Sequence, residues 1–92
     1  MRELTERAKE EFNARRAPEA VAEVLEVGDS FVHIRITGTG CRACGYDEHA
    51  VDFAFLLGDL LGTEVKVSGL EWEEEGLRAT LALGASAQKN RA

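Results

Sequence analysis

Cys41 and Cys44 are the two cysteines of this chain, and they lie two residues apart in the glycine-rich stretch TGTGCRACGYDEHA (Thr37–Ala50). Thiolates bind zinc and iron, and two of them supply half of a tetrahedral site. The remaining ligands would come from His49, from Asp47, or from the same two cysteines of a second chain. The pair therefore has three candidate roles: a metal or iron–sulfur site, thiol redox chemistry, or packing of two small side chains.

The surroundings of the cysteines favour the thiolate form. The pair is expected between the end of a strand and the start of a helix, where free N–H groups and the positive end of the helix dipole stabilise anions. Arg42 adds a positive charge between the two thiols. The redox role has the least support, because a thioredoxin-like protein has a proline facing its motif and Pro18 is the only proline here. No catalytic triad, phosphate loop or paired buried carboxylates are evident, so the sequence favours a non-enzymatic role.

Composition restricts the class of protein further. The chain has 92 residues and a formal net charge of −6, which argues against nucleic acid as a partner because phosphates require a basic surface. No apolar run approaches the length of a membrane span, and the polar start MRELTERAKEEF does not resemble a signal peptide. We therefore expect a cytoplasmic protein that does not associate with membranes.

Periodicity predicts two helices and four strands. Helical spacing of apolar residues marks the two helices, and alternation marks the strands. The order predicts one α+β fold, α-β-β-α-β-β, with a four-stranded, mostly antiparallel sheet and both helices on one face. We expect residues 1–17 to form the N-terminal helix, 18–84 the α+β domain with its cysteine loop, and 85–92 a disordered tail. The predicted elements are Arg2–Arg16, Ala20–Val27, Ser30–Thr37, Asp47–Leu61, Glu64–Trp72 and Leu77–Leu83.

The second predicted helix is apolar around most of its circumference. Asp47 is expected to cap it, Gly62 to end it, and Gly58 inside it to mark a close approach of another backbone or a ligand. A single sheet face in so small a chain cannot cover all of its apolar surface. We therefore predict a homodimer that buries either the N-terminal helix or the flank of this helix. The flank residues are Val51, Phe55 and Leu56, and the predicted buried sheet residues are Val32, Ile34, Ile36, Leu81 and Leu83.

The order of these segments resembles the 4-vinyl-reductase-type domain, a small ligand-binding module. The resemblance covers about Val21 to Leu83: a strand, a cysteine loop, the helix FAFLLGDLLG, then TEVKVSGLEW, a turn and LRATLAL. It implies a non-enzymatic module that holds a small apolar ligand between helix and sheet, with the cysteine loop at the mouth. The predicted ligand-contacting residues are Tyr46, Phe53, Leu57 and Gly58.

The stretch FVHIRITGTGCRACG also resembles the C-terminal iron–sulfur scaffold domain of NifU-type proteins. In that family two subunits share one cluster through four cysteines, which would account for a chain with only two. This resemblance implies the alternative function, an iron–sulfur or zinc carrier that uses the Cys-x-x-Cys of two subunits. The predicted metal ligands are Cys41, Cys44 and His49.

Overall fold

The structure, a computed structural model, describes residues 2–39 and 42–84. Two helices and four strands follow one another in the predicted order α-β-β-α-β-β, and the α+β class is confirmed. The predicted tail, 85–92, lies outside the described residues. The elements are α1 (Arg2–Arg16), β1 (Val21–Val27), β2 (Phe31–Thr37), α2 (Arg42–Leu61), β3 (Val65–Trp72) and β4 (Leu77–Leu83).

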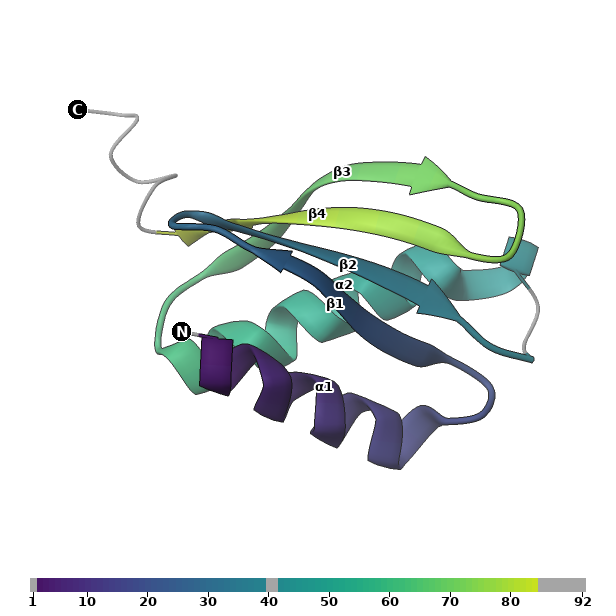
Figure 1. Ribbon diagram of the computed structural model, residues 1–92, viewed down its shortest axis with the longest axis horizontal. Helices are drawn as coiled ribbons and strands as arrows, with labels where there is room; N and C mark the ends of the chain where they lie inside the picture. The colour runs from purple at the N-terminus through teal and green to yellow at the C-terminus, as the bar shows by residue number, and fades with distance from the viewer. Residues whose placement is uncertain (1, 40–41, 85–92) are drawn as a thin grey trace.

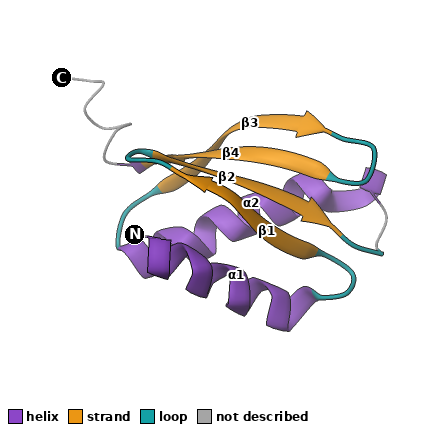
Figure 2. Cartoon of the chain, viewed as in Figure 1, coloured by secondary structure: helices purple, strands orange, loops and turns teal. Residues whose placement is uncertain are grey.

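The four strands form one antiparallel sheet in the order β1-β2-β4-β3, so that β1 and β3 are its edges (Figure 1). Both helices pack on the same face (Figure 2), with α1 beside β1 and α2 mainly beneath β3. Alternate residues of β2 and β4 point to the helices and are buried, as the alternating sequence predicts. The buried sheet residues include Val32, Ile34, Ile36, Leu77, Ala79, Leu81 and Leu83.

The second helix begins earlier than predicted. It starts at Arg42 and is interrupted at Gly45, whose backbone is not helical, so that Asp47 lies within the helix and is not its N-cap. Its end agrees with the prediction, because Gly62 has a φ of 72°, the left-handed conformation that glycine adopts most readily. A Cβ atom at Gly58 would lie 2.8 Å from the carbonyl oxygen of Thr63, so the close neighbour is the chain's own backbone.

Candidate functional site

The residues predicted to bind metal are only partly described. Cys41 lies outside the described residues, and Cys44 lies in the first turn of α2 with a side chain outside the described part. His49 is half-buried in α2, where its ring makes a T-shaped contact with Phe12 of α1, at 6.0 Å between centroids. Its Nδ1 atom is buried and has no hydrogen-bond partner among the described residues. Those residues contain no group of three His, Cys, Asp or Glu suited to a metal ion, and the three-ligand site stays a prediction.

Two residues predicted to contact an apolar ligand, Phe53 and Leu57, belong to the core. Both are fully buried, and Phe53 packs against Phe12 of α1 with the ring centroids 5.6 Å apart. Protein interiors are close-packed, so side chains in such positions fill the space between helix and sheet themselves. The space between α2 and the sheet is therefore filled at these two residues, and a ligand of this helix has to bind at its exposed side.

Tyr46 connects α2 to the loop before it and to β3. Its ring is buried and stacks on Trp72 at 6.4 Å between centroids, with the two planes 14° apart. Its hydroxyl donates a hydrogen bond of 3.0 Å to the carbonyl oxygen of Gly38, just after β2. Gly38 and Tyr46 flank the segment that carries the two cysteines. Their hydrogen bond joins the two ends of this segment, and the stacked ring of Tyr46 places them near Trp72.

Gly58 lines a cavity on the outer side of α2. The cavity measures about 220 Å³ and lies where α2 passes the start of β3. The apolar part of its lining comes from Ala54, Phe55 and Val65. The polar part comes from Thr63 and from the carboxylates of Asp59 and Glu64. We refer to this cavity as the α2–β3 groove.

Four large apolar side chains are exposed on α2 and β3. The exposed fractions are 55% for Val51, 76% for Phe55, 47% for Leu70 and 50% for Trp72. Val51 and Phe55 are one helical turn apart and therefore lie on the same side of α2. Leu70 and Trp72 pair with Ala79 and Leu77, which face the helices, so they too point to the helix side of the sheet. We call these four residues, with the groove beside them, the α2–β3 apolar surface.

A β-bulge in β3 explains why the sequence did not reveal Leu70 and Trp72. Val67 pairs with Leu81 but Gly69 pairs with Thr80, so one extra residue is accommodated at Ser68. A bulge moves every following side chain to the opposite face from the one that strict alternation predicts. The signal in the sequence was the Ser-Gly dipeptide within an otherwise alternating strand.

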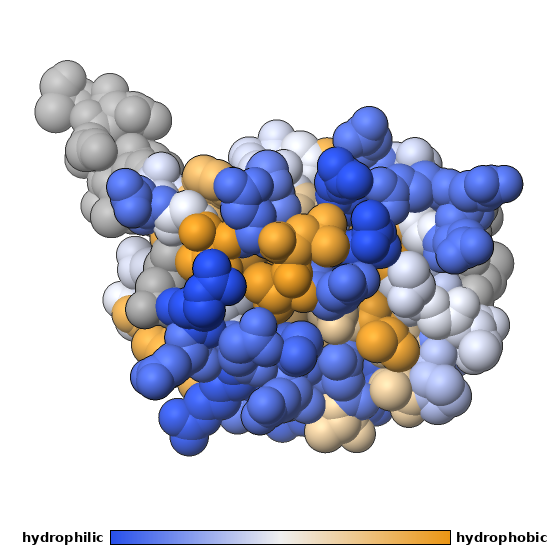
Figure 3. Space-filling view, viewed as in Figure 1, coloured by the Kyte–Doolittle hydropathy of each residue, from blue (hydrophilic) through white to orange (hydrophobic). Residues whose placement is uncertain are grey.

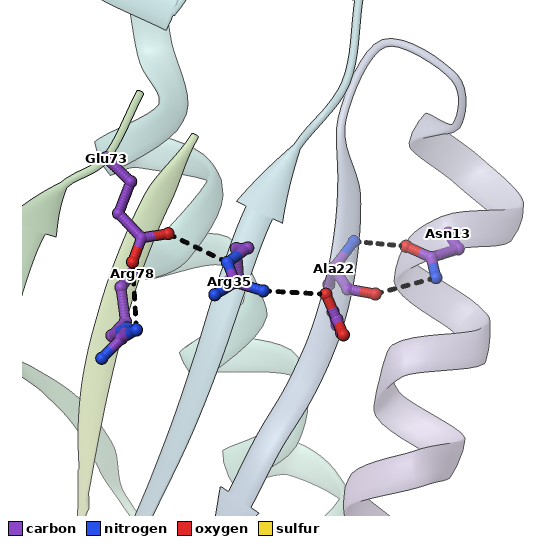
Figure 4. A network of polar contacts seen from close by, with 6 residues as sticks. Asn13, Ala22, Arg35, Glu73 and Arg78 are labelled. Carbon is purple, nitrogen blue, oxygen red and sulfur yellow. Dashed lines mark hydrogen bonds and ion pairs between the residues drawn. The ribbon is translucent and has the colours of Figure 1, made fainter. Parts of the chain in front are cut away.

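The opposite face of the sheet carries a row of charges. Glu23, Arg35, Arg78 and Glu71 are register partners, one from each strand, so that the row crosses the whole sheet. Glu73 joins the two arginines: its carboxylate lies 2.9 Å from Arg35 Nε and 3.1 Å from a guanidinium nitrogen of Arg78 (Figure 4). The hydrogen bond from Arg35 and the charges of both arginines hold the pKa of Glu73 below its ordinary value. Carboxylates within the row thus neutralise both arginines, and little positive charge remains for an anionic ligand. We call Arg35, Glu73 and Arg78 the clasp, because their ion pairs join β2 and β4 to the turn after β3.

Figure 3 shows a face of the molecule that is mostly hydrophilic. Hydrophilic side chains cover α1 in this view, and a smaller apolar patch lies near the middle of the face. The large apolar residues that are exposed among the described residues come instead from α2 and β3. Monomeric proteins seldom expose several large apolar side chains together unless the surface binds something. The α2–β3 apolar surface is therefore the candidate functional site.

No protein-family model, curated protein or solved structure matches this chain.

The clasp at Glu73 makes stability depend on pH. A carboxyl whose pKa is depressed in the folded state stabilises the fold above its unfolded pKa, and that contribution is lost as the pH falls through the folded value. We predict that Glu73→Gln lowers the urea midpoint at neutral pH and that the difference from wild type disappears well below about pH 4. Glu75→Gln, which removes an exposed charge in the same turn, is the control. A difference that stayed constant down to acid pH would contradict the assignment.

Proposed function

We propose that the protein is a non-enzymatic binding module for a small apolar ligand, and that the ligand binds in the α2–β3 groove. The observation that supports this most is the position of Phe55, which is the most exposed of the large apolar residues and also forms a wall of the cavity. Burying a side chain of this size contributes about 1.5–3 kcal/mol. The exposed ring thus provides a driving force for binding at this position.

The dimensions and charge of the groove restrict the ligand. A dry apolar cavity of roughly 150 Å³ accepts benzene, whereas drug-sized ligands occupy pockets of roughly 300–1,000 Å³. At about 220 Å³ the groove suits a molecule of one or two rings or a short branched chain. Asp59 and Glu64 repel anions, so we propose an uncharged ligand and not a fatty acid or another carboxylate.

We propose that the cysteine loop borders the apolar surface at the end of β3. Tyr46 stacks on Trp72 and donates a hydrogen bond to Gly38, so the residues that flank the loop lie near the end of this strand. The groove lies at the other end of β3, where Val65 lines it.

We also propose that the module acts as a homodimer in the cytoplasm. The dimer would cover the apolar flank of α2, where Val51 and Phe55 are exposed. Within the described residues, no helix has the length and apolar character needed to cross a membrane.

A second candidate function is that of a zinc or iron–sulfur carrier. It is favoured by His49, whose buried Nδ1 atom has no hydrogen-bond partner among the described residues. A buried polar atom without a partner is costly, and coordination of a metal would satisfy it. In this function Cys41 and Cys44 supply thiolates, and the remaining ligands come from His49 or from a second chain.

Binding of the ligand is testable by titrating naphthalene into the protein and following the amide NMR signals of Gly58 and Val65, which line the groove. We predict saturable shifts of these signals. Phe55→Ser should weaken binding about tenfold, since it removes one apolar wall. Phe31→Ser, which removes an aromatic ring from the opposite face of the sheet, should leave the affinity unchanged. Equal affinity of wild type and Phe55→Ser would contradict the proposed site.

Metal content after anaerobic purification tests the second candidate. Two chains that pool four cysteines give about one-half equivalent of zinc or cluster per chain, and a site that uses His49 gives about one. In the second case His49→Ala removes the metal, and His33→Ala, the control at the other histidine, does not. Cys44→Ser abolishes binding in both cases. Metal-free protein whose stability is unaffected by Cys41→Ser and Cys44→Ser would refute a metal function.

A further inference from the structure

The two edges of the sheet are not equivalent. At β1, the side-chain amide of Asn13 occupies the edge: the N–H of Ala22 donates to Oδ1 at 2.7 Å, and Nδ2 donates to the carbonyl oxygen of Ala22 at 3.2 Å (Figure 4). This pair of bonds satisfies the outward backbone groups of Ala22, and α1 packs against the same strand. At the other edge, β3 pairs with β4 alone among the described strands. Unpaired edges are templates for another strand.

The sequence of β3 is self-complementary about its own centre, between Ser68 and Gly69. Lys66 and Glu71 are placed symmetrically about this point, as are the apolar pairs Val65 with Trp72 and Val67 with Leu70. In a regular strand, residues five positions apart face opposite sides. The bulge at Ser68 brings Lys66 and Glu71 to the open face and the four apolar residues to the helix side.

We propose that β3 pairs antiparallel with β3 of a second copy of this chain, with Lys66 opposite the partner's Glu71 and Glu71 opposite the partner's Lys66. The inference rests on the proposed homodimer and names its interface. A two-fold contact uses the same surface on both subunits and therefore needs a self-complementary pattern, which the two charges supply. A strand from a different protein would not require this symmetry in β3.

The same pairing brings the apolar surfaces of the two chains together. Beneath the joined strands the two α2 helices lie on one face, and Val51 and Phe55 of each face the partner. Val65 lies opposite the partner's Trp72, at the end of the α2–β3 groove that Val65 lines. The partner's Trp72 thus covers the groove, and the proposed ligand site becomes enclosed only in the dimer.

Charge reversal with mixing tests this arrangement. Lys66→Glu places two carboxylates opposite each other at both ends of the interface, and Glu71→Lys places two amines there. Each variant alone should dimerise about tenfold more weakly than wild type in sedimentation equilibrium. An equimolar mixture should recover the wild-type affinity as a heterodimer, because every contact then joins Lys to Glu. Lys9→Glu and Glu10→Lys on α1 change the net charge equally and should leave dimerisation unchanged, separately or mixed.

The outcomes distinguish this inference from the proposed function. Wild-type protein that stays monomeric at high micromolar concentration would refute the homodimer and the interface together, while naphthalene binding would still be measurable on the monomer. A wild-type dimer that both charge variants form equally well would refute the β3 interface and retain the homodimer. Variants that weaken the dimer separately but fail to recover on mixing would refute the register. Recovery in the mixture also shows that both variants are folded.

Discussion

The packing of α2 against two neighbours at once is the constraint on which the rest of the structure depends. One side of the helix lies on the sheet and buries Ala50 and Leu57, while Phe53 also reaches Phe12 of α1. With α1 beside β1 and in contact with one flank of α2, the other flank is left at the edge of β3. The exposed apolar residues of α2 and β3 gather there because no described element remains to cover them.

This arrangement places α1 against the β1 edge of the sheet and leaves the β3 edge beside the exposed flank of α2. Asn13 satisfies the outward backbone groups of Ala22, and the Arg35–Glu73–Arg78 clasp ties β2 and β4 to the turn that follows β3 on the open face. The polar groups of both contacts are already paired within the chain, so they add little free energy for binding a partner. Burial of Phe55 and Trp72 would contribute more binding free energy, at about 1.5–3 kcal/mol for each large side chain. The chemistry of the surface therefore favours recognition at β3 and α2.

The sequence predicted most of the fold because most of its patterns are uninterrupted. FVHIRIT and LRATLAL alternate without a break, so their buried residues followed from period two alone. Two features depend on tertiary structure instead. The bulge at Ser68 occurs where β3 pairs with β4, and it places Leu70 and Trp72 on the opposite face from the one that strict alternation would give. Whether Phe53 lines a site or fills the core depends on how tightly α1, α2 and the sheet pack, which no periodicity encodes. Of the candidate site, the sequence therefore predicted Gly58 as a ligand contact and Phe55 as part of a dimer interface, but no residue of β3.

The central claim is that the apolar surface of α2 and β3 is where this protein meets its ligand and its partner. Two-dimensional ¹H–¹⁵N NMR spectra, recorded first over a dilution series and then with added naphthalene, test it most directly. The account predicts that dilution shifts amide signals of Val65–Trp72 and of the turn around Phe55, and that naphthalene shifts those around Gly58, while Ala22 and its neighbours in β1 stay constant in both. Shifts confined to α1, β1 or the charged face of the sheet would contradict it.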